Sequence, residues 1–363
     1  MSRRTLALVF GGRSPEHDVS LVSARGIHEN LDKSRYDVHL VGVARSGEPR
    51  IGGVELFDGA MDQGQGIPVR WPSFPGDRCL RRTADGHVVS PPLEVAFPII
   101  HGAGGEDGTI QGLFALAGVP CVGAGVLGSS LAMDKDRCRR MLQQAGIPVV
   151  SDRVFEGPQA LDAAWVLPQI QPLGWPLFVK PARAGSSVGI TKISSPADLA
   201  AALRAAYEID TKVIVERAIL GARELETAVL GNLEPQASVV GEIVPHGEFY
   251  DYKAKYVDPE SRLLIPAPID TALSDRIRTF ATQAFRALDL MGLARVDFLL
   301  SRTTGELVLN EPNTLPGFTP ISMYPKLWEA SGVPYPELLD RLIELALQAA
   351  SMGALRSPGE RRH

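Results

Sequence analysis

The stretch LVLNEPNTLPGF, residues 307–318, begins as an apolar strand and then places two polar side chains, Glu311 and Asn313, before a turn at Pro316 and Gly317. Alternate positions of a strand share one face, so Glu311 and Asn313 should project to the same side. A carboxylate that ends an apolar strand is hard to explain by packing, because burying an unpaired charge costs free energy. The pattern therefore indicates a polar site at this end of the strand.

A second strand pattern, ARVDFLL at 294–300, precedes this stretch and is joined to it by the short connection SRTTG. A hairpin would bring Arg295 and Asp297 onto the face of Glu311 and Asn313, provided that odd positions pair with odd positions. Asp, Glu and Asn supply hard oxygen ligands but too few to enclose a metal ion, which suits Mg2+ that shares its shell with water and nucleotide phosphates. The alternative is a solvated hairpin edge with incidental charges.

Composition excludes several classes of protein. The 363 residues suggest two or three domains, and 37 Lys and Arg against 42 Asp and Glu give a net charge of -5 without a basic segment. This argues against nonspecific nucleic-acid binding and a polybasic membrane anchor. The apolar run LALVF near the start is too short for a signal peptide, and no stretch approaches bilayer length. We expect a globular cytoplasmic protein with reduced cysteines.

Short β-branched runs alternate with helical patterns, which predicts mixed α/β domains that begin with a βαβ unit. The Gly- and Pro-rich region 46–92 is expected to be loop-like with an added hairpin. The predicted elements are strand 6–10, helix 19–31, strands 36–43 and 95–100, helix 134–145, strands 176–180 and 190–193, a helix from 196, strands 212–216, 222–231 and 237–244, helix 274–290, strands 294–300 and 305–311, and helical segments to about 352.

The segment PLFVKPARAGSSVGI, residues 176–190, combines a buried-looking strand that ends at Lys180 with a loop rich in free backbone N–H groups around Ser186 and Ser187. Such a loop can bind an anion. The spacing is not that of a Walker P-loop, and GSSVG taken alone is equally a flexible turn. Lys135, at the start of another predicted helix, would offer phosphate a second positive charge.

Two further segments have both a functional and an ordinary interpretation. In VIVERAILGARELE, residues 213–226, the backbone near Glu216 could meet a planar base, and Glu224 could accept hydrogen bonds from ribose hydroxyls. Exposed charges at strand ends would look the same. The segment FYDYKAKY, residues 249–256, could close over a ligand as a lid, or it could be a surface loop that packs its own tyrosines.

Taken together in order, these segments resemble the ATP-grasp fold and, more narrowly, the D-alanine:D-alanine ligase family. The resemblance covers most of the chain and is carried by GGRSPEHDVS (11–20), HGAGGEDGTIQG (101–112), AMDK (132–135), FVKPARAGSSVG (178–189), VERAILGARELE (215–226), DYKAKY (251–256), RVDF (295–298) and NEPNTLPGFTPIS (310–322). It implies a three-domain α/β protein with a Rossmann-like N-terminal domain at 1–125, a central subdomain at 126–215 and a C-terminal subdomain at 216–363. ATP would lie between two antiparallel sheets, under a lid at about 246–262.

The resemblance also implies a role for each matching residue. The implied ATP contacts are Lys135, Lys180, Glu216, Arg217, Ile219, Glu224, Lys255 and Asn310. Asp297, Glu311 and Asn313 would hold two Mg2+ ions, with Mn2+ able to substitute. The implied substrate contacts are Glu16, Val19 and His101 for the first D-alanine, Ser322 and Met323 for the second, and Ser187 in the glycine loop. The implied catalytic set is Glu16, Ser186, Tyr256, Arg295 and Gly317, of which Glu16, Ser186 and Tyr256 would form one hydrogen-bonded group.

The implied reaction joins two D-alanines through an acyl phosphate for peptidoglycan precursors. The amine of the second D-alanine attacks this intermediate, and Arg295 with the Gly317 backbone N–H would stabilise the oxyanion. A homodimer is expected by resemblance. Two positions depart from the commonest family pattern, Ala184 in the glycine loop and Arg217 after the central strand, and the pair Lys255 and Tyr256 favours the dipeptide product. The alternatives are another ATP-grasp ligase, including one that takes D-lactate or D-serine, and a catalytically silent nucleotide-binding module.

Overall fold

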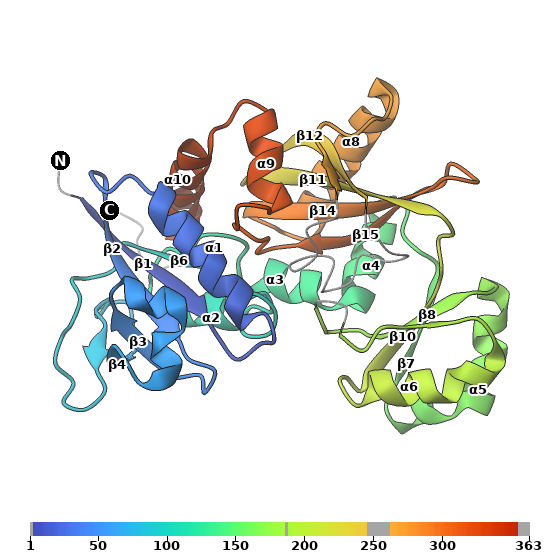
Figure 1. Cartoon of the computed structure of the whole chain (residues 1–363), viewed down its shortest axis with the longest axis horizontal. Helices are drawn as coiled ribbons and strands as arrows, with labels where there is room; N and C mark the ends of the chain where they lie inside the picture. The colour runs from blue at the N-terminus through green and yellow to red at the C-terminus, as the bar shows by residue number, and fades with distance from the viewer. Residues whose placement is uncertain (1–2, 186–187, 245–261, 355–363) are drawn as a thin grey trace, which may run out of the picture.

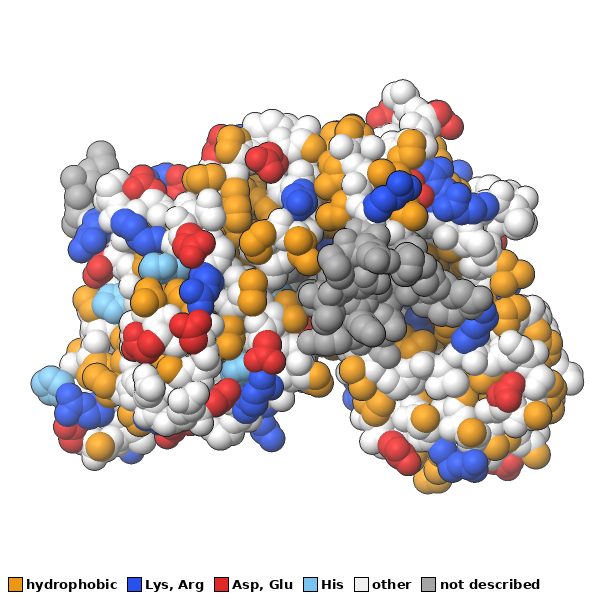
Figure 2. Space-filling view, viewed as in Figure 1, with side chains coloured by type: hydrophobic (Ala, Val, Ile, Leu, Met, Phe, Trp, Pro, Cys, Tyr) orange, Lys and Arg blue, Asp and Glu red, His pale blue; other side chains and the backbone are white. Residues whose placement is uncertain are grey.

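The computed structural model describes residues 3–185, 188–244 and 262–354. Three sheets build the molecule, and each lies in a different part of the chain (Figure 1). Helices pack on these sheets and fill the space between the first and the third. On the face seen in Figure 2, basic and acidic side chains are interspersed. No helix in the described ranges is long and apolar enough to cross a membrane.

The first sheet has the strand order β5-β4-β3-β2-β1-β6. Its centre is parallel, because β1 pairs in parallel with β2 on one side and with β6 on the other. The helix α1 connects β1 to β2, which confirms the predicted βαβ start. The bounds are β1 (Arg4–Gly11), α1 (His17–Asn30), β2 (Tyr36–Val43), β3 (Pro49–Gly52), β4 (Ile67–Arg70), β5 (Arg81–Arg82) and β6 (Val95–Pro98). The region predicted to be loop-like adds three short strands, β3 to β5, as an antiparallel extension of β2. Their brevity explains why periodicity did not reveal more than a hairpin.

The second sheet is antiparallel with the order β7-β10-β8-β9. Its elements are β7 (Asp152–Glu156), α5 (Ala163–Ile170), β8 (Leu177–Pro181), β9 (Thr191–Ile193), α6 (Leu199–Tyr207) and β10 (Lys212–Arg217). Val213 and Val215 of β10 pack with Leu203 of α6 in a core of their own. Because side chains alternate along a strand, Glu216 takes the opposite face of β10, away from this core.

The third sheet is antiparallel with the order β13-β12-β11-β14-β15. Its elements are β11 (Ala222–Gly231), β12 (Gln236–Val244), β13 (Arg262–Leu264), α8 (Thr271–Ala287), β14 (Gly292–Ser301) and β15 (Leu307–Asn313). The helix α8 covers one face, where Ile277 and Phe285 are fully buried with Val296 and Phe298. This helix starts three residues before the predicted start, since the side chain of Asp270 accepts a hydrogen bond from the Leu273 N–H and caps it.

The remaining helices connect these layers. They are α2 (Thr109–Leu116), α3 (Val126–Met133), α4 (Lys135–Gln144), α9 (Met323–Ala330) and α10 (Tyr335–Ala354), with the short 3-10 helices η1 (Val54–Asp58), η2 (Ala60–Gln63), η3 (Pro158–Leu161), η4 (Gln171–Leu173) and η5 (Pro196–Asp198). Both α9 and α10 share one apolar core with α1 and β1, so the end of the chain packs against its beginning (Figure 1). This continuous core joins the first and third sheets. The boundaries predicted at residues 125 and 215 stay predictions.

Candidate active site

The register of the hairpin β14–β15 decides whether the predicted site can form. Asp297 pairs with Glu311, and Arg295 pairs with Asn313, so the odd-with-odd register is confirmed at this end of the hairpin. A β-bulge follows, because Phe298 pairs with Leu309 and leaves Asn310 as an extra residue. The bulge lets the consecutive residues Asn310 and Glu311 line the same cavity while the apolar pair stays in the core.

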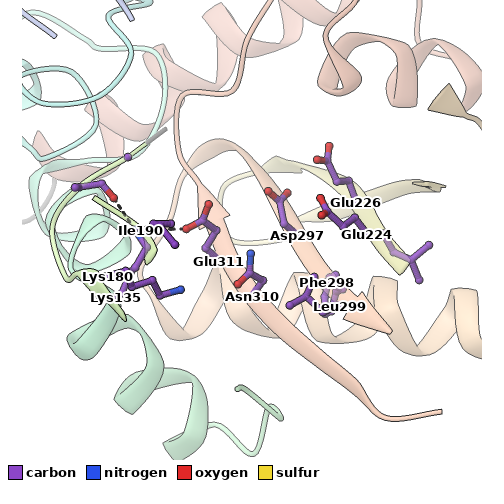
Figure 3. Close-up of a pocket in the computed structure, with 13 residues that line it drawn as sticks. Lys135, Lys180, Ile190, Glu224, Glu226, Asp297, Phe298, Leu299, Asn310 and Glu311 are labelled. Atoms are coloured by element: carbon purple, nitrogen blue, oxygen red, sulfur yellow. Dashed lines mark hydrogen bonds and ion pairs between the residues drawn. The ribbon is translucent and has the colours of Figure 1, made fainter. Parts of the chain in front are cut away.

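A cavity lies between the second and third sheets (Figure 3). It brings together six of the predicted site residues, which are Lys135, Lys180, Glu224, Asp297, Asn310 and Glu311. A neighbouring cavity is lined by the predicted residues Glu16, Lys135, Arg295, Glu311 and Asn313. Lys135 and Glu311 line both cavities, so the two form one continuous polar region that reaches the start of α1.

The start of α4 places Lys135 between the two sheets. Asp134 caps this helix by accepting hydrogen bonds from the N–H groups of Asp136 and Arg137. The Lys135 ammonium donates to the Ala184 carbonyl at 2.7 Å and lies 3.5 Å from a Glu311 carboxylate oxygen. The lysine therefore bridges the glycine loop and the hairpin.

Lys180 belongs to a buried ion network that only the structure reveals. Its ammonium lies 2.8 Å from the Glu216 carboxylate, and the same carboxylate lies 2.5 Å from the guanidinium of Arg139. Arg139 also reaches Asp152 at 2.6 Å. Lys135 and Arg139 are four residues apart on α4 and so share a helix face, which was the signal that could have identified Arg139.

Burial and charge act against each other in this network. Burial lowers the pKa of Lys180 to about 8, and the attraction of Glu216 only partly compensates. For Glu216 burial favours the neutral acid, but Arg139 and Lys180 outweigh it and hold the pKa of the carboxyl below its ordinary value. Glu216 is therefore an anion in a buried position, with both of its cations in direct contact.

The third sheet presents a row of carboxylates toward the cavity. Glu226 of β11 pairs with Asp297 of β14, which pairs with Glu311 of β15, so three acidic residues stand side by side across three strands (Figure 3). The guanidinium of Arg295 lies 3.0 Å from Glu226 and makes two hydrogen bonds of 2.7 Å to Asp297. Glu226 was missed by sequence reasoning, although its alternation with Glu224 along the strand places both on one face.

The donor set fits a metal ion that is completed by a nucleotide. In the described part of the chain, no group of three or more His, Cys, Asp or Glu residues is arranged to hold a metal ion. Asp297, Glu311 and Asn313 supply hard oxygen atoms from paired positions or from alternate positions of one strand. Such a set suits Mg2+, which keeps several waters or phosphate oxygens in its shell.

The predicted contacts of the first amino acid lie where α1 begins. Glu16 precedes the first residue of α1 and is 7% exposed, and Val19 and His101 are buried nearby. A β-carbon on Gly102 would lie 2.9 Å from a Glu16 carboxylate oxygen, and one on Gly185 would lie 3.7 Å from it. The Glu16 carboxylate is thus enclosed by the loop after β6 and by the glycine loop after β8.

The predicted contacts of the second amino acid lie between β15 and α9. A β-carbon on Gly317 would lie 2.6 Å from the Ser322 hydroxyl oxygen, so only glycine fits here without a shift. That hydroxyl oxygen accepts a hydrogen bond from the Thr319 N–H at 3.0 Å, and Met323 starts α9. Neither cavity is lined by Val19, His101, Gly317, Ser322 or Met323, among the residues described for it.

Three of the residues predicted to contact ATP are not among the described lining residues of either cavity: Glu216, Arg217 and Ile219. Glu216 faces its two cations, and Arg217 pairs with Glu306 at 2.6 Å. Four predicted site residues, which are Ser186, Ser187, Lys255 and Tyr256, lie outside the described residues, as does nearly all of the predicted lid. The predicted roles of all of these residues stay predictions.

Known proteins match this chain over nearly all of its length. The family model described as "D-ala D-ala ligase N-terminus" matches residues 5–124, and the one described as "D-ala D-ala ligase C-terminus" matches residues 141–344. The protein named D-alanine--D-alanine ligase from Thermoanaerobacter sp. (strain X514) is 48% identical over 352 residues, which is 96% of this chain and 98% of that protein. Its namesake from Deinococcus radiodurans is 47% identical over 353 residues, covering 95% of this chain and 99% of that one.

Solved structures agree with the sequence relatives. The VanG D-Ala:D-Ser ligase from Enterococcus faecalis superposes with a TM-score of 0.85 at 38% identity and covers 95% of this chain and 100% of that one. The D-alanine-D-alanine ligase from Coxiella burnetii has a TM-score of 0.85 at 32% identity, with 98% and 97% covered. The ATP-grasp architecture with two antiparallel sheets is therefore confirmed. With both family models matched and a cavity of the expected residue types between those sheets, the chain belongs to the D-alanine:D-alanine ligase family.

Proposed function

We infer that this protein is an ADP-forming ligase that uses ATP to join two D-alanine molecules. The product, D-alanyl-D-alanine, would serve peptidoglycan precursors. The observation that carries the inference is the hairpin register, in which Asp297 stands opposite Glu311 on one wall of a cavity that also contains Lys135 and Lys180. Cations and carboxylates around one cavity suit a substrate that combines phosphates with a metal ion. The similarity to ligases over nearly all of the chain narrows the class of enzyme to this family.

A carboxylate is a poor electrophile, so the reaction starts by transferring the terminal phosphoryl group of ATP to the first D-alanine. Catalysis of this step is mainly positioning and neutralisation of charge, for which Lys135 and Lys180 are suited. Glu16 would hold the ammonium of the first D-alanine, with Val19 and His101 beside it. ADP departs as the leaving group, and the phosphorylated carboxylate is an acyl phosphate.

The amine of the second D-alanine then attacks the acyl carbon, and phosphate leaves with the carbon–oxygen bond electrons. The tetrahedral oxyanion needs hydrogen-bond donors, and Arg295 with the Gly317 backbone N–H would supply them. Ser322 and the backbone of Met323 would bind the carboxylate of this second D-alanine. The amine loses one proton, which phosphate or a network of Ser186 and Tyr256 would take.

Asp297, Glu311 and Asn313 would hold two Mg2+ ions, and Mn2+ could replace them. When bound, the metal would neutralise phosphate charge. Arg295 lies 2.7 Å from Asp297 and Lys135 lies 3.5 Å from Glu311, so each of these carboxylates already has a cation beside it.

The nucleotide and the rest of the substrate would meet further residues around the cavity. Glu224 would accept hydrogen bonds from ribose, and Asn310 would contact the nucleotide from the bulge. The adenine would lie near Glu216, Arg217 and Ile219. Lys255 would reach the terminal phosphate, and Ser187 would contact the substrate from the glycine loop. The domains would run from 1–125, 126–215 and 216–363, in a cytoplasmic homodimer.

The test is release of ADP and phosphate by the purified protein with ATP, Mg2+ and D-alanine. D-Alanyl-D-alanine should form in the same molar amount as ADP. Because a solved relative is named a D-Ala:D-Ser ligase, D-serine and D-lactate should be offered as second substrates beside D-alanine. No turnover with D-alanine, together with turnover of another acceptor, would contradict the proposal. ATP binding without ADP formation under any condition would favour a silent nucleotide-binding module.

A further inference from the structure

We propose that Ser23 of α1 and Tyr335 of α10 are positioning residues for the reaction, because together they hold the backbone of Phe318 and so fix the loop that carries Gly317. The inference rests on the proposed function, in which the Gly317 N–H stabilises the oxyanion. Neither residue lines the described part of either cavity. Both would act through the loop and would not touch substrate.

Phe318 is held at both of its backbone polar groups. Its N–H donates to the Ser23 hydroxyl oxygen at 3.2 Å, and its carbonyl accepts from the Tyr335 hydroxyl at 2.9 Å. A β-carbon on Gly26 would lie 2.7 Å from the same carbonyl oxygen, so α1 also approaches the loop closely. The Phe318 ring is fully buried and contacts the rings of Phe97 and Tyr335. The residue after Gly317 therefore has little freedom to move.

The Ser23 hydroxyl is fully used, which follows from the tautomer of His101. The His101 Nδ1 atom lies 3.0 Å from the Leu315 carbonyl oxygen, which can only accept, so Nδ1 carries a proton. In the neutral ring Nε2 is then an acceptor, and the Ser23 hydroxyl at 3.1 Å must donate to it. The Ser23 oxygen is left to accept the Phe318 N–H. Ser23 itself is fully buried, so no water can replace it readily.

The loop is held at two positions, one on each side of Gly317. His101 holds Leu315 before Gly317, and Ser23 with Tyr335 holds Phe318 after it. Among the described residues, the Gly317 N–H has no hydrogen-bond acceptor, so the segment between the anchors presents a donor. The direction of this N–H depends on His101 and Ser23, from the N-terminal part of the chain, and on Tyr335 of the C-terminal helix α10. The orientation of the oxyanion donor therefore depends on how the first sheet and its helices pack against the third sheet.

The experiment compares Ser23→Ala and Tyr335→Phe with wild type in steady-state kinetics. Ser23→Ala leaves the Phe318 N–H and His101 Nε2 buried without partners, and a displacement of about 1 Å costs roughly 100-fold in rate. We expect kcat to fall between about 10-fold and 100-fold in Ser23→Ala and roughly fivefold in Tyr335→Phe. The KM for D-alanine at the second position should rise, whereas the KM for ATP should stay within about twofold, since the anchors lie away from the phosphate-binding lysines.

Two matched variants control for a general loss of stability. Ser331→Ala removes a hydroxyl that likewise donates to one carbonyl, of Leu327, and accepts one N–H, of Val239, away from the loop. Tyr36→Phe removes a tyrosine hydroxyl that donates to Asp340 of α10 at 2.8 Å. Both controls should keep the kcat of the wild type at a temperature where all variants are folded.

The outcomes separate the two proposals. Wild type without turnover on D-alanine would contradict the proposed function. An active wild type whose Ser23→Ala and Tyr335→Phe variants keep the kcat of their controls would overturn the positioning role. An equal rise of the KM for ATP and for D-alanine would also overturn it, because a general structural defect would produce it. If Ser23→Ala fails to fold, Tyr335→Phe decides the question by the same measurements.

Discussion

The two antiparallel sheets on either side of the cavity hold their charges in different ways. On the second sheet, Lys180 and Glu216 form a network with Arg139 of α4, and their side chains are 6%, 8% and 3% exposed. On the third sheet, Asp297 and Arg295 are 13% and 14% exposed, and Glu311 is 34% exposed. The lysine wall is thus prearranged by buried partners, whereas the carboxylate wall keeps charges that a ligand can reach.

The two sheets also differ in how they join the rest of the molecule. The third sheet shares an apolar core with the N-terminal sheet through α9 and α10. The core of the second sheet contains only residues of its own segment, and ion pairs connect that segment to other parts of the chain. Two such links are Lys212 to Asp134 at 2.8 Å and Arg217 to Glu306 at 2.6 Å. Substitutions in the buried network of the lysine wall should therefore mainly lower stability. Substitutions in the carboxylate wall should mainly lower activity.

The largest expected effect on activity is that of Glu311→Gln on the reachable wall. The change keeps the shape of the side chain but removes one negative oxygen ligand, so kcat/KM for ATP should fall more than about 100-fold. ADP release as a function of Mg2+ concentration would measure this, and excess Mg2+ should restore part of the rate. Glu306→Gln on the same hairpin is the control. Near wild-type turnover in Glu311→Gln would contradict the metal assignment.

Removal of Arg139 should mainly destabilise the protein. Arg139→Met removes the buried cation that pairs with both Glu216 and Asp152, and breaking a buried ion pair costs roughly 3–5 kcal/mol. Urea denaturation of Arg139→Met and Arg139→Lys would test this, with the lysine variant losing less because it keeps the charge. Equal stability of Arg139→Met and wild type would show that the network does not support this wall.

The pH dependence should report the buried lysine. Because burial lowers the pKa of Lys180 to about 8, the free enzyme loses this positive charge as the pH rises through 8, and kcat/KM for ATP should fall there. Glu216 raises this pKa by attraction, so Glu216→Gln should move the alkaline limb to lower pH by about one unit. A limb that stays in place in Glu216→Gln would assign it to another group.

The smallest effect is expected for the ion pair between Arg217 and Glu306. Its side chains are 34% and 38% exposed, and exposed pairs contribute less than about 1 kcal/mol. Arg217→Ala should change both the unfolding free energy and the KM for ATP only slightly. A loss of ATP affinity of more than about tenfold would show that the side chain itself contacts the nucleotide.

Particular elements show what sequence reasoning could reach. The strand 36–43 and the strand 222–231 were predicted with their observed bounds. Strand-forming residues fill each segment, and residues typical of turns lie near its ends. The hairpin pairing of Asp297 with Glu311 was stated as a condition and is confirmed, but the bulge at Asn310 was not foreseen. A bulge depends on how both faces of a pair pack, and one strand pattern does not carry that information.

The sequence by itself determined the order of many of the strands and helices, the residue types of the polar site and the family, because periodicity and motif order are local properties of the chain. Only the tertiary structure decided which charges and hydroxyls meet. Arg139 reaches Glu216 across 77 positions, and Ser23 reaches the Phe318 N–H across 295. Such partners are chosen by the packing of whole sheets and helices, since burial forces each polar group to find a nearby partner regardless of its distance along the chain.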